Sequence, residues 1–241
     1  MTITAEPAKE GIPLKKLIVL LTTVLMLAGC SMSSGGGVNE EAGKMNLALH
    51  SAAERGDAAE LKKLIDGGAL LDSQDGRGRT AMMVATYANR PEAVRLLIEA
   101  GADINLQDDM LNNPFLYAGA EGLEDILDLL IKAKADTKIR NRYGGVAIIP
   151  ASEKGHVNNV RTLLEKTDIN VNHVNDLGWT ALLEAIILSD GGERHQQIVR
   201  LLLDHGADAN IADGEGVTPL QHAKRRGYAE IAKMVADAGG R

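Results

Sequence analysis

The chain has 241 residues, of which 45% are hydrophobic, and a formal net charge of −7. Proteins that bind nucleic acid are usually basic, so this acidic balance argues against nucleic acid as a ligand. Only one Phe and one Trp are present, and a chain so poor in aromatic residues is expected to bury them in its core.

The first thirty residues have the organisation of an export signal. A pair of lysines is followed by an uncharged run from Leu17 to Gly29 and then by the only cysteine, Cys30, which is typical of a secretion signal. The run is shorter than the roughly 20 apolar residues of a membrane-spanning helix. Its end, LAGC at Leu27–Cys30, resembles the cleavage site of bacterial lipoproteins. The resemblance implies that residues 1–29 are a signal peptide and that Cys30 is the site of lipid attachment.

The residues after Cys30 predict how the mature protein is held. Residues 30–44 contain SMSSGGG at Ser31–Gly37, a composition typical of a flexible tether. In the lipoproteins that the signal resembles, an aspartate after the cysteine retains the protein at the inner membrane. Ser31 stands there instead, so in an organism with an outer membrane we expect sorting to that membrane. The expected location is therefore the bacterial cell envelope, lipid-anchored and facing the periplasm.

Residues 45–241 contain a repeat with a period near 33. In each repeat a short apolar run around an alanine is followed by a break and a second run, such as ELKKLI or AVRLLI. Hydrophobic residues three and four apart in the second run indicate a helix. Two short helices cannot bury their apolar faces alone, so the pattern predicts a stacked solenoid. The residues that open the first helices, spaced by 33, 33, 33, 34 and 38, are Leu47, Thr80, Asn113, Val146, Thr180 and Thr218.

The repeats resemble ankyrin repeats. The family signature TPLHxA reads TPLQHA at Thr218–Ala223 and TALLEA at Thr180–Ala185. The resemblance implies an all-α ankyrin-repeat solenoid of about six helix-turn-helix units with β-hairpin fingers. It also implies a non-enzymatic scaffold without a cofactor, which binds a protein partner through a concave groove and the finger tips. One departure is Lys134, where complete repeats have glycine.

Catalytic and metal-binding motifs fit the sequence poorly. The six histidines never form a close ligand pair with a third donor, so no metal site is predicted. The segment DINVNHVNDLGW begins like a calcium loop, but His173 replaces the required glycine and Trp179 the bidentate glutamate. The alternative from another functional class is an accessory factor or hydrolase built on the insertion SDGGERHQ, with His195 as its reactive group.

The family resemblance also implies which residues contact the partner. In ankyrin repeats these are the finger tips and the residues just before the glycine between the helices. Tyr, Trp and Arg dominate binding hot spots, and three of the six aromatic residues fall at such positions; the alternative is that each of them covers a neighbouring finger. The protein-binding candidates are Arg77, Arg79, Tyr87, Met110, Arg142, Tyr143, Lys154, Leu177 and Trp179.

The predicted function is that of a monomeric, membrane-tethered scaffold that binds a protein in the bacterial cell envelope. Among binding proteins, the alternative is an immunity or antidote protein whose groove occludes the active site of a toxin.

Overall fold

The computed structural model describes residues 35–241, and every regular element in this range is a helix. The predicted signal peptide and Cys30 lie outside the described residues. One compact body comprises Ala42–Arg241. The helices are α2 Gly35–Arg55, α3 Ala58–Asp66, α4 Ala81–Tyr87, α5 Pro91–Glu99, α6 Pro114–Glu121, α7 Glu124–Lys132, α8 Ile148–Glu153, α9 Val157–Lys166, α10 Ala181–Ile187, α11 Glu193–Asp204, α12 Pro219–Arg225 and α13 Ala229–Asp237.

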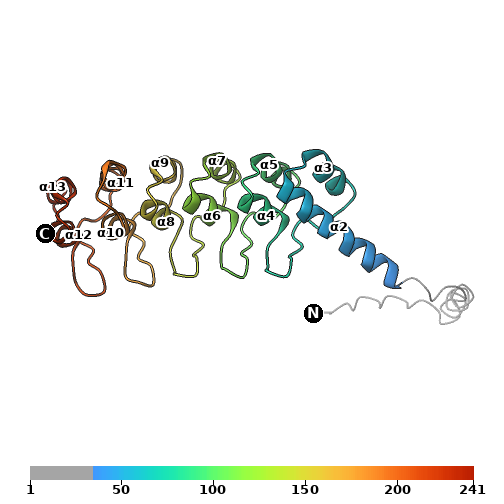
Figure 1. Cartoon of the computed structure of the whole chain (residues 1–241), viewed down its shortest axis with the longest axis horizontal. Helices are drawn as coiled ribbons and strands as arrows, with labels where there is room; N and C mark the ends of the chain where they lie inside the picture. Colours follow the sequence, from blue (N-terminus) through green and yellow to red (C-terminus); the bar gives the residue numbers. More distant parts are fainter. Residues whose placement is uncertain (1–34) are drawn as a thin grey trace, which may run out of the picture. The chain divides into compact units, whose positions relative to one another are not determined.

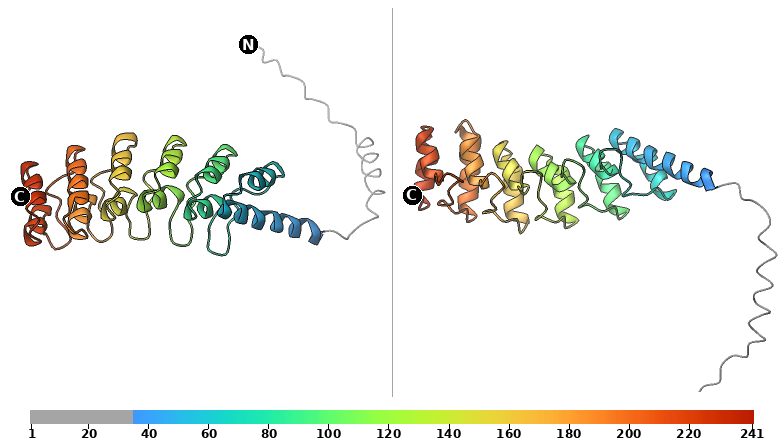
Figure 2. Two further views of the ribbon diagram at one scale, coloured as in Figure 1. Left: turned by 45° about the horizontal axis from the view of Figure 1, so that its top comes forward. Right: turned by 90° about the horizontal axis from the view of Figure 1, so that it is seen from below.

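The helices form six consecutive pairs, which we number as repeats 1 to 6, from α2–α3 to α12–α13. From α3 onward, helices pack against their equivalents in the adjacent repeats: α6 contacts α4 and α8, and α7 contacts α5 and α9. The second helices form one row and the first helices another, with long loops projecting on the same side (Figures 1 and 2). The predicted solenoid of about six repeats is confirmed.

Helix α2 starts before the predicted domain boundary. It begins at Gly35, so residues 35–44 of the predicted tether are helical in this structure. The segment VNEEAGKMNLALHSAAER contains many good helix formers, including Ala, Leu, Glu and Lys. The first helix of repeat 1 therefore extends upstream of residue 45, where the domain was predicted to begin.

Most of the first helices begin at the predicted opener. The side chains of Thr80, Asn113, Thr180 and Thr218 each accept a hydrogen bond from the backbone N–H three residues later, as N-cap residues do. Val146 has no side-chain acceptor, and α8 accordingly starts two residues later without a side-chain cap.

The loops before the first helices, which we call fingers, are built on an Asp or Asn. In each one, a side-chain oxygen of this residue accepts hydrogen bonds from the backbone N–H groups two and four residues later, at 2.9 to 3.1 Å. The predicted β-hairpins are wrong in one respect: residues 35–241 contain no strand. The backbone is closed across each finger by a bond such as that from the Asp75 N–H to the Arg79 carbonyl at 3.0 Å, but this pairing does not continue as a ladder. Fingers 1 to 5 are residues 75–79, 108–112, 141–145, 175–179 and 213–217.

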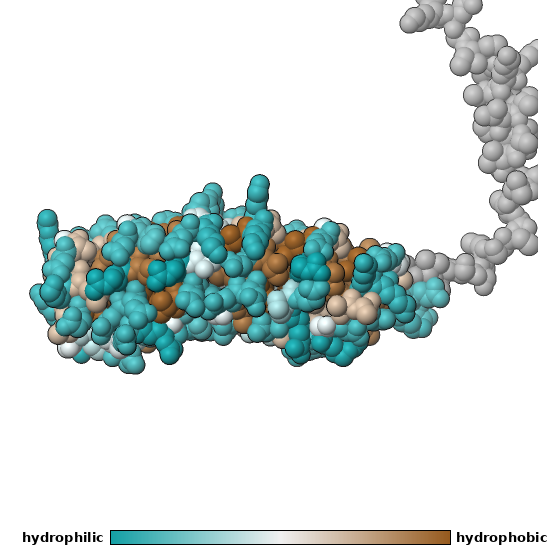
Figure 3. Space-filling view, turned by 90° about the horizontal axis from the view of Figure 1, so that it is seen from above, coloured by the Kyte–Doolittle hydropathy of each residue, from teal (hydrophilic) through white to brown (hydrophobic). Residues whose placement is uncertain are grey.

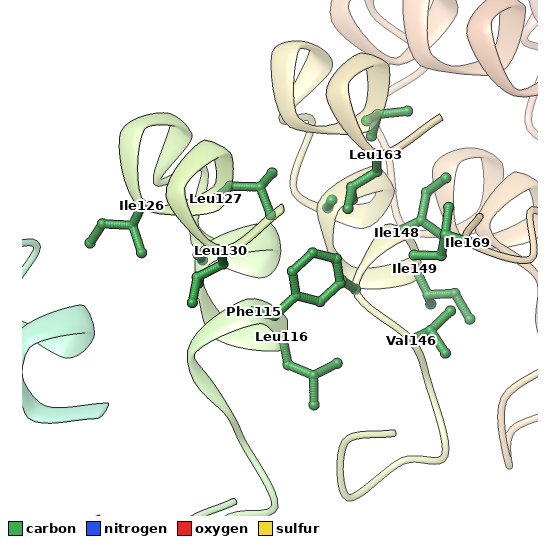
Figure 4. Close-up of a cluster of buried hydrophobic side chains, with 14 of the residues drawn as sticks. Phe115, Leu116, Ile126, Leu127, Leu130, Val146, Ile148, Ile149, Leu163 and Ile169 are labelled. Atoms are coloured by element: carbon green, nitrogen blue, oxygen red, sulfur yellow. The ribbon is translucent and has the colours of Figure 1, made fainter. Parts of the chain in front are cut away.

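A continuous hydrophobic core runs through the repeats. Phe115 of α6 is 1% exposed, and its ring lies between the side chains of Leu130 in its own repeat and Leu163 in the next (Figure 4). The face formed by the second helices is mainly hydrophilic, with hydrophobic side chains visible between them (Figure 3). Each repeat therefore completes the core of its neighbour, as a solenoid requires.

A second set of hydrogen bonds links successive repeats through the loops that follow the second helices. The side chains of Asp72, Asn105, Asn172 and Asn210 each accept a hydrogen bond from a backbone N–H of the next repeat, at 2.7 to 3.1 Å. Lys138 occupies the equivalent position between repeats 3 and 4 and cannot accept such a bond. There, the Thr137 hydroxyl donates to the Asp168 carboxylate at 2.7 Å instead.

Lys134→Gly is expected to stabilise the protein. Lys134 has φ +62°, whereas the equivalent residues of other repeats are glycines, such as Gly101 and Gly206. A non-glycine residue in this left-handed region costs about 1–2 kcal/mol, and the entropy lost by glycine offsets about half of this. Urea unfolding should show a gain of about 0.5–1 kcal/mol, while the control Lys132→Gly, at the last residue of α7, should lose up to about 1 kcal/mol. Equal losses in both variants would contradict the prediction.

Candidate functional site

A pocket of about 370 Å³ lies between the fingers and the first helices of repeats 3 to 5. Its walls are fingers 3 and 4 on one side and α6, α8 and α10 on the other. The pocket brings together four of the nine predicted binding residues, although they come from two repeats. These are Arg142, Tyr143, Lys154 and Leu177.

The tips of the three central fingers expose apolar side chains. Met110 of finger 2 is 46% exposed, Tyr143 of finger 3 is 51% exposed and Leu177 of finger 4 is 55% exposed. The tips of the outer fingers carry the exposed charged residues Arg77 and Glu215 instead. The exposed apolar row is thus confined to the repeats that form the pocket.

Arg142 joins two of these tips. Its guanidinium lies over the Tyr143 ring, 5.0 Å from the centroid, and one of its N–H groups points to the Met110 sulfur at 3.7 Å. A cation over an aromatic face is attracted by the ring. The tips of fingers 2 and 3 are thereby held side by side.

Sequence reasoning missed Leu111, the neighbour of Met110. Leu111 is 47% exposed and has φ +55°, where the other four fingers have glycine. A bulky residue in this conformation is strained, and such strain clusters at functional sites. The missing glycine in DDMLNN was the signal that could have identified it.

Two predicted binding residues are engaged within the stack. The Tyr87 hydroxyl donates to the Asp108 carboxylate at 2.5 Å and accepts from the Asn112 amide at 3.2 Å. Burial and the bond to Asp108 raise the pKa of Tyr87 to about 12. Arg79 forms an ion pair of 2.6 Å with Asp75 of its own finger. Both side chains therefore stabilise fingers.

Two further predicted binding residues, Lys154 and Trp179, differ in how exposed their side chains are. Lys154 is exposed and pairs with Glu121 of the previous repeat at 2.5 Å. Trp179 is only partly buried and lies at the end of finger 4, where its backbone N–H donates to the Asn175 side chain at 2.9 Å. The indole is therefore neither a core residue nor a fully exposed tip.

The pocket also contains Glu184 of α10, which is 5% exposed. Its carboxylate accepts a hydrogen bond from the Asn175 amide at 2.8 Å. Burial, and then the charge of Glu153, raise the pKa of Glu184 to about 7. A buried carboxylate at the bottom of a pocket is a second feature that sequence reasoning did not single out.

His195, the candidate of the enzymatic alternative, lies outside this pocket. Its Nε2 atom is 3.0 Å from the backbone oxygen of Glu153, and its Nδ1 atom is 3.6 Å from the Asp190 carboxylate. Its ring therefore links α11 to repeat 4. Within residues 35–241, no group of three or more His, Cys, Asp or Glu side chains is arranged to hold a metal ion.

Comparison with known proteins identifies the repeats. The family described as ankyrin repeats in three copies matches residues 21–108, 115–213 and 171–240. The chain belongs to the ankyrin repeat family. Ankyrin repeats generally mediate protein–protein interactions and typically form non-catalytic binding scaffolds.

Related ankyrin proteins occur in bacteria. YahD of Escherichia coli (strain K12), named as an ankyrin repeat protein, is 54% identical over 98 residues, which are 41% of this chain and 49% of YahD. The chain thus spans about half the length of this relative. An ankyrin repeat domain from Acinetobacter baumannii AYE is 53% identical, with a TM-score of 0.78, over 80% of this chain and 98% of that domain. The ankyrin repeat protein EF0377 is 42% identical, with a TM-score of 0.76, over 79% and 97%.

The ankyrin signature explains why Glu184 faces the pocket. Glu184 occupies the variable x position of TPLHxA, as do Tyr117 and Pro150 in repeats 3 and 4, and all three line the pocket. The polar residue in the apolar run ALLEAII was the sequence signal. The variable positions of three ankyrin repeats therefore form the side of the pocket that faces the fingers.

Proposed function

We propose that this ankyrin protein is a membrane-tethered scaffold that binds a protein partner in the bacterial cell envelope. The observation that carries the binding role is the pocket between fingers and first helices, bordered by the exposed apolar tips of fingers 2 to 4. Exposed apolar patches on soluble domains mark interaction sites. The envelope location is supported by the lipoprotein-like signal that ends at Cys30.

The tips are suited to bind a protein surface. Tyr143 offers a large apolar face with few rotatable bonds, and Arg142 already fixes its orientation. A binding residue that is ordered before association loses less conformational entropy on binding. The Met110 side chain beside them adapts easily to different apolar surfaces. We therefore place the centre of the interface on fingers 2 to 4.

Tyr143→Ala is expected to weaken partner binding by about 2 kcal/mol or more, as for a hot-spot aromatic residue. The partner can be trapped in cells by a photo-crosslinking amino acid at position 143. The control position is Leu70, which is 61% exposed but lies after α3, away from the pocket. Crosslinks at position 143 and not at position 70 are expected. Crosslinking confined to position 70, or at neither position, would reject the assignment of the interface.

Cys30→Ala is expected to release the protein from the membrane fraction. The acyl chains on Cys30 would provide the attachment, since each buried methylene contributes about 0.8 kcal/mol. No helix within residues 35–241 is long and apolar enough to cross a bilayer. Fractionation and intact mass of wild type, Cys30→Ala and the control Ser31→Ala test this. An unchanged mass and an unchanged distribution of Cys30→Ala would rule out the lipid anchor.

A further inference from the structure

The bottom of the pocket contains two carboxylates without a cation. Glu184 of α10 is almost fully buried, and its only hydrogen-bond donor among residues 35–241 is the amide of Asn175. Glu153 of α8 lines the same pocket, and no side chain in the described range donates to its carboxylate. Both carboxylates line one pocket, and the charge of Glu153 adds to burial in raising the pKa of Glu184.

The cations of the pocket are engaged elsewhere. The Lys154 ammonium pairs with Glu121 at 2.5 Å, and the Arg142 guanidinium lies over Tyr143 and beside Met110 at the finger tips. Neither cation forms an ion pair with the two carboxylates at the bottom. Burying a charged group without an opposite charge is costly, so this site is complementary to a cation that the described part of the chain does not supply.

We propose that the pocket receives a lysine or arginine side chain from an extended segment of the protein partner. This inference rests on the proposed binding function. The long apolar stem of such a side chain would pass Tyr143 and Leu177, and its charged end would meet Glu153 and Glu184. Lysine and arginine combine an apolar stem with a charged end in this way, and the aromatic face of Tyr143 also attracts a cation. A volume of about 370 Å³ is large enough for one such side chain.

Selection from a library of random peptides displayed on phage tests the inference. The baits are the wild-type full-length chain, the double variant Glu153→Gln/Glu184→Gln, and Tyr143→Ala. A control bait, Glu193→Gln/Glu215→Gln, removes the same number of charges from exposed positions outside the pocket. Glutamine keeps an oxygen that can accept the bond from Asn175, so the double variant changes charge with little change in shape.

We expect the wild type and the control to enrich peptides with Lys or Arg flanked by apolar residues. The double variant should lose this preference, and Tyr143→Ala should lose binding. In fluorescence polarisation, replacing the basic residue of an enriched peptide by norleucine should weaken binding to the wild type by about tenfold or more. The same replacement should change binding to the double variant by less than about threefold.

Three outcomes would overturn the inference. Enrichment of peptides that lack a basic residue but still require Tyr143 would mean that the pocket binds peptides without a preference for a cation. A basic preference that persists in the double variant would place the cation elsewhere on this acidic chain. Absence of enrichment on every bait would also reject it, whereas crosslinking at position 143 tests the proposed binding function separately.

Discussion

Phe115→Ala should lower the free energy of unfolding by about 3–5 kcal/mol, as truncation of a buried aromatic residue typically does. The Phe115 ring is 1% exposed and fills the space between repeats 3 and 4 (Figure 4). The backbone around it belongs to two separate helix pairs, which cannot collapse into the cavity without disturbing the stack. Urea unfolding followed by circular dichroism measures the loss.

Tyr143→Ala is the matched control for this prediction, because it removes an aromatic ring from a side chain that is 51% exposed. Its effect should stay within about 0.5 kcal/mol, as at ordinary surface positions. A loss below about 1 kcal/mol for Phe115→Ala would mean that the repeats do not depend on this contact. A comparable loss in both variants would mean that finger 3 is part of the core.

Glu184→Gln is expected to stabilise the unliganded protein at pH 8 by up to about 3 kcal/mol. Burial, with the charge of Glu153, raises the pKa of Glu184 to about 7 from an ordinary value of 4.5. A shift of one pKa unit corresponds to about 1.4 kcal/mol. The folded state therefore holds the proton more tightly than the unfolded state, and stability associated with Glu184 is fully present below pH 4.5 and is lost as the pH rises through about 7.

The pH dependence of urea unfolding between pH 4.5 and 8 tests this prediction. The wild type should lose stability across this range through Glu184, and the slope should be smaller in Glu184→Gln, whose side chain stays neutral. Glu215→Gln, in exposed finger 5, is the control and should leave the slope unchanged. A Glu184→Gln variant that is less stable than wild type at pH 8 would show that the carboxylate has a favourable partner in the folded state.

The fold could be predicted from sequence because it depends on short-range patterns. The threonine openers cap their helices, and hydrophobic residues three and four apart bury the faces of the second helices. The pattern fails where a residue departs from it: Val146 cannot cap, and α8 starts later. The β-hairpins were a wrong inference from the family: each finger, such as residues 75–79, closes through a backbone bond and bonds to one side chain, and no strand forms within residues 35–241.

The candidate site could be predicted only in part. Tyr143 and Leu177 have exposed side chains in the pocket, which their position in the finger indicates. Tyr87 occupies an equally suggestive position, but its hydroxyl bonds to Asp108, twenty-one residues later. Sequence periodicity shows which face a residue occupies and does not show which polar group it meets. Glu184 was missed for the same reason, since only the fold brings it into one pocket with Glu153.

The replacement of an Asp or Asn by Lys138 changes where repeats 3 and 4 are joined. At the other junctions described, a side chain in the loop after a second helix bonds to the backbone of the next repeat, whereas here Thr137 and Asp168 bond side chain to side chain. The bond from a side chain to the neighbouring backbone lies instead in the core, where the buried Asn159 amide donates to the carbonyl oxygens of Ala118 and Gly119 at 2.9 and 3.2 Å. Because Ala118 and Gly119 belong to α6, one of the helices that line the pocket, this junction ties the pocket wall to the second helix of the next repeat.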